Sequence, residues 1–190
     1  MVDLWETLST NRLVLRKILY DDVEFVRKHF GDEEVCRYMV DNEPITTLEE
    51  AEEIIKWSHS DHTKPSNNRW LIVLKETNQP IGTIGYHRWD PNNSIAEIGY
   101  DLSKEYWKQG LMNEAMELVL QFGFEKMGLN RIQAFVHIEN IASYNILKKN
   151  SFCCEGIIRD MYFFRGKYHD HYLMSLLMKE YKRSCRVQPY

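Results

Sequence analysis

Several features are missing from these 190 residues, and each absence removes a class of protein from consideration. No apolar run reaches the roughly 20 residues of a membrane-spanning helix, and the opening residues, MVDLWETLST, do not resemble a signal peptide. The 24 basic and 28 acidic residues give a formal charge of -4, which favours neither a nucleic-acid partner nor an anionic membrane. We therefore expect a cytoplasmic protein that binds neither nucleic acid nor membrane.

Metal motifs and nucleotide-binding motifs are missing as well. The four cysteines show no zinc-like pairing: Cys36, Cys153, Cys154 and Cys185. We expect reduced thiols, with Cys153 or Cys154 in the core. Two histidine groups, HSDH (His59–His62) and HDH (His169–His171), lack the helical H-E-x-x-H pattern, so we expect no metal site.

The apolar pattern predicts one mixed α/β domain over residues 1–190, in the order β-α-α-β-β-β-α-β-α-β-β. The predicted strands are Asn11–Ile18, Arg69–Glu76, Ile81–Trp89, Ser94–Leu102, Arg131–Ile138 and two strands within 152–179 around a turn at Arg165–Lys167. Capping boxes at Asp21 with Glu24 and at Thr47 with Glu50 predict the first two helices. The other two helices follow Gly110 and Asn140. Gly99, inside a strand, predicts a bulge or the close approach of another backbone.

The stretch YWKQGLMNEA (106–115) joins a predicted strand to a predicted helix through Gly110. It matches neither G-x-x-x-x-G-K-[ST] nor G-x-G-x-x-G, so neither a nucleotide hydrolase nor a dinucleotide fold is indicated. The first turn of a helix nevertheless has unpaired N–H groups and a partly positive end, which suit a phosphate. Gly110 allows close approach and Lys108 adds charge. On these residues alone, a phosphate site and a plain turn both stay open.

Blocks found in order along nearly the whole chain resemble the GNAT superfamily, most closely its RimJ/RimL-like branch of ribosomal-protein N-terminal acetyltransferases. They are TNRLVLRKILYDD, PIGTIGY, AEIGYDLSKEYWKQGLMNEA, NRIQAFVHIENIASYNILKKNSF and EGIIRDMYFFRGKYHDHYLMSLL. The resemblance implies the GNAT fold, a central, mostly antiparallel sheet of about seven strands flanked by about four helices. It also implies acetyl transfer from acetyl-CoA, without a metal, to a primary amine, most of all a protein N-terminus. The alternatives are a small amine (polyamine, amino acid or aminoglycoside) and a non-catalytic CoA-binding module.

The resemblance also implies a cofactor site. The pyrophosphate motif [RQ]-x-x-G-x-[GA] falls on six residues: Trp107, Lys108, Gln109, Gly110, Leu111 and Met112. The next residue, Asn113, is also expected to bind the cofactor. Trp107 and Met112 depart from the pattern, which backbone binding would tolerate. A second motif contributes Asn140 and Lys149, with Ser151 in place of its glycine. Backbone groups from Tyr100 to Leu102 are expected to pair with the pantetheine arm.

For catalysis, the resemblance implies that Glu97 is the base, directly or through water, and that the amine attacks the thioester without a protein nucleophile. A backbone N–H near Gly99 or Tyr100 is expected to face the acetyl oxygen. Many family members place a tyrosine acid where this chain has Leu147, so Ser143 is the expected proton donor to the thiolate, with Tyr144 less favoured.

For several of these residues a purely structural role is also open. Glu97 could be a surface carboxylate, and Asn140 could be a helix cap and nothing more. Trp57 and Trp70 could line an acceptor pocket, although two core residues are the favoured reading. The aromatic stretch MYFFRGKYHDHYLM (161–174) could form a homodimer.

Overall fold

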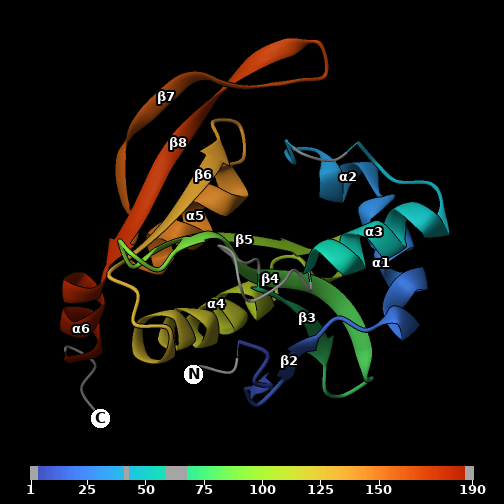
Figure 1. Cartoon of the computed structure of the whole chain (residues 1–190), viewed down its shortest axis with the longest axis horizontal. Coiled ribbons are helices and arrows are strands. Elements are labelled where there is room, and N and C mark those ends of the chain that lie inside the picture. Colours follow the sequence, from blue (N-terminus) through green and yellow to red (C-terminus); the bar gives the residue numbers. More distant parts are fainter. Residues whose placement is uncertain (1–3, 41–42, 59–67, 187–190) are drawn as a thin grey trace.

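The structure, a computed structural model, describes residues 4–40, 43–58 and 68–186 and is built on one eight-stranded sheet (Figure 1). In spatial order its strands are β1 (Leu8–Ser9), β2 (Leu13–Lys17), β3 (Asn68–Leu74), β4 (Gln79–Asp90), β5 (Ile95–Leu102), β6 (Arg131–His137), β8 (Lys167–Leu177) and β7 (Cys153–Phe164). Every neighbouring pair is antiparallel except β5 with β6. The expected fold, with a mostly antiparallel sheet and a meander of three strands, is confirmed.

The helices are α1 (Val23–Phe30), α2 (Glu33–Cys36), α3 (Leu48–Ser58), α4 (Leu111–Gln121), α5 (Ile141–Lys149) and α6 (Met178–Arg186). Short turns of other helix types are η1 (Tyr20–Asp22), η2 (Lys104–Tyr106) and η3 (Phe122–Lys126). Relative to the expected elements, β1, α2 and α6 are additional, and the last predicted strand gives way to α6 after Leu177. No helix in the described part of the chain is long and apolar enough to cross a membrane.

Both faces of the sheet are covered, and side chains of β3 point alternately into the two cores. Trp70 and Ile72 point into the core on the α4 side, whereas Leu71 and Val73 point into the core beneath α1 and α3. Trp70 is fully buried, as the favoured reading expected. The strand is therefore apolar at nearly every position, as a strand buried on both faces should be.

The side-chain capping predictions were right at two positions and wrong at one. Thr47 and Glu50 form the expected reciprocal box, because Glu50 N donates to Thr47 Oγ1 (3.2 Å) and Thr47 N donates to Glu50 Oε2 (2.9 Å). Asn140 caps α5 by accepting from Ser143 N (3.1 Å). Asp21 with Glu24 is not a capping box; the buried neighbour Asp22 takes that place by accepting from Leu19 N (2.8 Å).

The prediction that one of the two adjacent cysteines lies in the core was also largely wrong. Cys153 is exposed, and Cys154 is only half-buried against the core on the α4 side. Both lie on β7, the edge strand of the sheet, where one side has no neighbouring strand to cover it. Of the three cysteines whose burial the structure describes, Cys36 is the one that is fully buried, and burial raises its pKa to about 11.

The parallel pair β5–β6 opens into a wedge. Its strands pair only at Ile95–Arg131, Ala96–Ile132 and Glu97–Gln133, and beyond Glu97 they separate, as Figure 1 shows. The predicted bulge at Gly99 was wrong: Gly99 pairs regularly with Gly85, and the irregularity lies in β4 between His87 and Asp90. The backbone groups of β5 from Ile98 onward are thereby left without a partner strand on the β6 side.

Gly99 is needed for a different reason from the expected one. A Cβ at this position would lie 2.5 Å from Cε1 of His87 and 3.3 Å from Nη1 of Arg69. Side chains from β4 and β3, not another backbone, pass over Gly99.

Candidate active site

The turn before α4 is shaped for an anion. Gly110 is the N-cap in the left-handed conformation (φ 78°), and Lys108 is also left-handed (φ 60°). No side chain in the described part of the protein caps this helix end, so the first-turn N–H groups have no side-chain partner there. Leu111 and Met112 are 2% and 5% exposed and pack in the core, which explains how a large residue is accommodated where the family motif has a small one.

Two residues that the sequence reasoning missed hold this turn against β2. Arg12 donates from Nη1 to Gln109 O (3.2 Å) and from Nε to Glu114 Oε2 (2.7 Å). Thr10 Oγ1 also donates to Glu114. Partial burial raises the pKa of Glu114, but the hydrogen bonds from Thr10 and Arg12 outweigh it, so the net pKa is lowered. The charged Glu114 therefore fixes the start of α4.

A cavity of about 800 Å³ occupies the wedge between β5 and β6 and reaches the α4 turn. It is lined by all but one of the residues predicted for the cofactor: Tyr100, Leu102, Trp107, Lys108, Gly110, Leu111, Met112, Asn113, Asn140 and Lys149. Gln109 is outside the lining and donates from its side chain to Glu105 O (2.8 Å). Sequence reasoning missed Tyr38 and Phe135, which no local motif marks.

Ser143 lies in this cavity beside a second hydroxyl group. The Tyr100 hydroxyl is 2.8 Å from Ser143 Oγ, and this hydrogen bond connects β5 to α5 across the wedge. Burial raises the pKa of Tyr100 well above its usual range, so the phenol keeps its proton. Leu147 is fully buried, and Tyr144 packs against Tyr172 with ring centroids 5.0 Å apart. Tyr100 was expected to contribute only its backbone.

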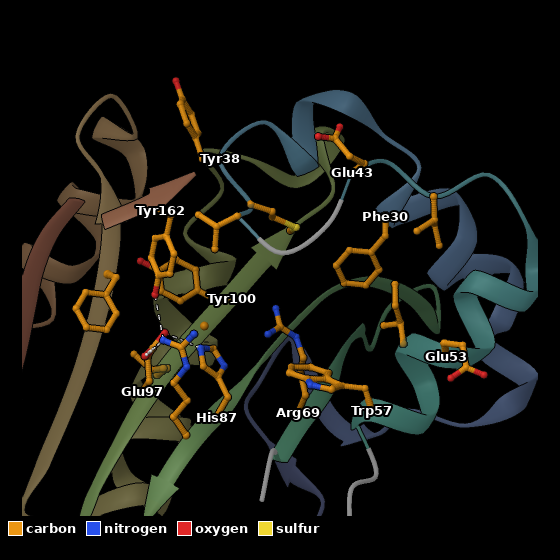
Figure 2. A pocket seen from close by; sticks show the side chains of 18 of the residues that line it. Phe30, Tyr38, Glu43, Glu53, Trp57, Arg69, His87, Glu97, Tyr100 and Tyr162 are labelled. Atoms are coloured by element: carbon orange, nitrogen blue, oxygen red, sulfur yellow. Dashed lines mark hydrogen bonds and ion pairs between the residues drawn. The ribbon is translucent and has the colours of Figure 1, made fainter. Parts of the chain in front are cut away.

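A second cavity, of about 930 Å³, lies on the α1–α3 side of the sheet and contains Glu97 (Figure 2). Glu97 is only 8% exposed, so it is not a surface carboxylate. Its Oε1 is 3.0 Å from His87 Nε2 and its Oε2 is 3.1 Å from Arg88 Nη1. Arg88 also donates to the Tyr162 hydroxyl (3.0 Å), which links this cavity to β7.

A buried charge network supports the floor of the second cavity. Asp101 accepts from Arg69 Nη2, from Thr83 Oγ1 (2.7 Å) and pairs with His29 Nε2 (2.7 Å). Burial alone would raise the pKa of Asp101, but the charge of Arg69 and the bond to His29 lower it well below its usual range. Arg69 is thereby fixed with its guanidinium group directed into the cavity, as Figure 2 shows.

The outer part of the second cavity is acidic and aromatic. Glu43, Glu50 and Glu53 line it together with Trp57, which is 44% exposed. Figure 2 shows Glu43, Glu53 and Trp57. The favoured reading of Trp57 as a core residue was therefore wrong. Carboxylates and an exposed aromatic ring are groups that attract a cation.

The two cavities meet at the middle of β5. Six residues line both: Tyr38, Met39, Ile98, Gly99, Tyr100 and Phe135. A ligand in the wedge and a ligand beside Glu97 would therefore touch at Gly99 and Tyr100. This geometry suits the transfer of a group between two bound molecules.

The HDH group does not form a metal centre. His169 Nδ1 is 2.8 Å from His137 Nε2, and His171 packs edge-on against His137. Within residues 4–40, 43–58 and 68–186, no group of three or more histidine, cysteine or acidic side chains could hold a metal ion. The HSDH group lies outside the described residues.

Comparisons with known proteins agree with this geometry. Residues 12–152 match the family described as acetyltransferase (GNAT) domain. The "uncharacterized N-acetyltransferase p20" of Bacillus licheniformis is 39% identical, over 93% of this chain and 98% of its own length. The ribosomal-protein-serine acetyltransferase of Escherichia coli is 28% identical over 54% of this chain and 56% of its own. Spermidine N-acetyltransferase from Vibrio cholerae, solved with CoA and spermine, superposes with a TM-score of 0.80 at 21% identity, covering 91% of this chain and 99% of its own.

Proposed function

Because this chain belongs to the GNAT family of acetyl-CoA-dependent N-acetyltransferases, we propose that it acetylates a cationic primary amine bound in the cavity at Glu97. The observation that carries the proposal is the meeting of the two cavities at Gly99 and Tyr100, beside a buried carboxylate. Acetyl-CoA occupies the wedge, and the amine reaches its thioester from the opposite side of β5.

Different residues of the wedge bind different parts of the cofactor. The unpaired N–H groups at the start of α4 bind the pyrophosphate, with Lys108 adding charge. The free edge of β5 from Tyr100 to Leu102 pairs with the pantetheine arm. Asn113 accepts from Asn150 Nδ2 (2.9 Å), which joins the beginning of α4 to the end of α5 around the cofactor. The chemistry that acetyl-CoA supplies is a thioester, whose carbonyl carbon an amine can attack.

Acetyl transfer then needs a base, an oxyanion donor and an acid. Glu97 supplies the base, directly or through a group that it holds, and a backbone N–H near Gly99 or Tyr100 stabilises the acetyl oxygen. Ser143, in contact with the Tyr100 hydroxyl, protonates the leaving thiolate. The amine forms its bond to the acetyl carbon and the carbon–sulfur bond then breaks, so no acetylated side chain is formed.

Two acceptors fit this proposal. The RimJ/RimL-like resemblance favours a protein N-terminal amine, and a relative named ribosomal-protein-serine acetyltransferase supports it. A polyamine is favoured by Glu43, Glu50 and Glu53 around the outer cavity, since a second cationic group of the acceptor would find carboxylates there. A neighbour named spermidine N-acetyltransferase supports that choice.

The test is an acceptor panel read by release of the CoA thiol. Peptides with free N-termini, polyamines, amino acids and an aminoglycoside are compared by kcat/KM with wild-type protein. Glu97→Gln should lower kcat by about 100- to 10,000-fold, because a positioned base contributes that much. The affinity of Glu97→Gln for acetyl-CoA should stay the same. The matched control is Glu76→Gln, because Glu76 is exposed in a turn outside both cavities. Full activity of Glu97→Gln, or no acetylation of any amine by the wild type, would refute the proposal.

We propose that residues 1–190 act as one cytoplasmic domain and that the β7–β8 hairpin, which extends beyond the rest of the sheet in Figure 1, pairs with a second copy. Phe163 and Tyr168, near its tip, are 62% and 61% exposed. Light scattering on wild-type protein and on Phe163→Ser distinguishes monomer from dimer.

A further inference from the structure

We propose that His87 is the group that takes the proton from the acceptor amine, with Glu97 holding its ring. The inference rests on the proposed function and adds a catalytic residue that neither the motifs nor the resemblance indicated. It starts from the surroundings of Glu97, where both carboxylate oxygens are already engaged. His87 donates to Oε1 and Arg88 donates to Oε2. The Glu97 side chain is only 10% exposed, against 21% for that of His87, so the imidazole ring is the more accessible of the two groups to an amine.

His87 is oriented by the bond to Glu97. An ionised carboxylate is only an acceptor, so Nε2 of His87 carries the hydrogen in the 3.0 Å contact and Nδ1 is left with its lone pair in the neutral ring. Among the described residues, no group hydrogen-bonds to Nδ1. The ring is 21% exposed and lines the second cavity. The unpaired nitrogen is therefore accessible to a ligand.

The free edge of the ring lies where the two cavities join. A Cβ on Gly99 would be 2.5 Å from His87 Cε1 and 3.3 Å from Nδ1, so this edge lies directly over Gly99. Gly99 lines both cavities. An amine that attacks a thioester at this point would have Nδ1 beside it, whereas Glu97 lies one ring farther away. Figure 2 shows His87 between Glu97 and Arg69 along one side of the cavity.

The proton and electron movements balance without another reactant. The cationic amine first releases one proton to water. The neutral amine then forms a nitrogen–carbon bond to the acetyl carbon, and its next proton moves to Nδ1 as the carbonyl oxygen gains charge. The resulting imidazolium is stabilised by Glu97 through Nε2–H. Collapse breaks the carbon–sulfur bond and the thiolate takes a proton from Ser143. His87 then returns its proton to water, and water restores the proton of Ser143. Imidazole suits this role because it exchanges protons near neutral pH.

The pH dependence of kcat/KM reports on several coupled groups, because charged side chains from several elements lie around the His87 ring. Glu97 contacts it from β5, and Arg69 of β3 also reaches over Gly99. Other titratable or charged groups line the same cavity from α3, β4, β7, β8 and the segment after α2: Glu43, Glu50, Glu53, Arg88, Tyr162 and His171. The acid limb of kcat/KM is therefore assigned by comparing variants and not by its midpoint alone.

The test compares His87→Gln, Glu97→Gln and the double variant on the best acceptor, with His169→Gln, on β8 and outside both cavities, as the matched control. We expect His87→Gln to lose about 100- to 10,000-fold in kcat/KM and to lose the acid limb of the pH profile, while the Kd for acetyl-CoA changes less than about twofold. The double variant should be no slower than His87→Gln, since the two residues act as one unit.

A second measurement does not depend on the folding of His87→Gln. In His87→Ala, added imidazole should restore part of the turnover, which a merely structural role would not allow. If His87→Gln keeps its activity and acid limb while Glu97→Gln loses both, the inference fails and the proposed function stands. If the wild type acetylates no amine, the proposed function fails and the inference falls with it.

Discussion

Replacing Gly110 by alanine separates the shape of the α4 turn from the stability of the fold. Gly110 has φ 78°, where an L-residue costs about 1–2 kcal/mol. The added Cβ meets nothing nearer than Arg12 Nη2 at 3.8 Å, so the penalty is backbone strain and not a clash. For a chain of this size, that strain lowers Tm by about 2–8 °C.

The same strain should weaken cofactor binding if the turn relaxes to relieve it. Each backbone hydrogen bond to a charged phosphate contributes about 1.5–3 kcal/mol, so losing one raises the Kd for CoA by about ten- to a hundredfold. Gly128→Ala is the matched control. Gly128 also has a positive φ (68°), a Cβ added there would have no described residue within 4 Å, and it lies outside the cavity.

Calorimetric titration with CoA and urea unfolding of both variants are the assays. We expect similar losses of stability in the two, with the CoA affinity reduced only in Gly110→Ala. An unchanged Kd in Gly110→Ala, together with the expected loss of stability, would refute pyrophosphate binding at this turn.

Two further predictions concern the polar groups on either side of β5. Ser143→Ala should lower kcat by about 100- to 10,000-fold with poor leaving thiols affected most, and equal kcat in stopped-flow assays would exclude Ser143 as the acid. Asp101→Asn should lower the free energy of unfolding by about 3–5 kcal/mol in urea, because Arg69 loses its buried partner. Since the folded pKa of Asp101 is depressed, its contribution is present above the unfolded value of about 4 and is lost as pH falls below it. The Asp101→Asn variant should therefore depend less on pH in that acid range, and a parallel pH dependence would contradict the network.

Local signals predicted much of the fold and half of the site. The caps at Thr47 and Asn140 and the glycine at 110 act within a few residues of themselves, so the sequence displays them directly. The clamp of Arg12 on Glu114 joins residues about a hundred positions apart, and no local pattern marks it.

The acceptor side was harder to predict because it depends on strand register. His87, Arg69 and Glu97 come together only because β3, β4 and β5 pair in one register that places the three on the same face. The need for glycine at 99 likewise arises from side chains of neighbouring strands, which is why a bulge was wrongly expected there. Trp57 and Trp70 look alike in the sequence, yet one lines a cavity and the other is core.

The measurement that tests the central claim most directly is the stability of the wild-type protein with and without acetyl-CoA. Ligand at a hundred times its Kd should add about 2.7 kcal/mol, which raises Tm by about 5–10 °C. Acetyl-CoA and CoA should both stabilise the protein, and ATP should do so far less. No stabilisation at millimolar acetyl-CoA would contradict binding of the cofactor in the wedge between β5 and β6.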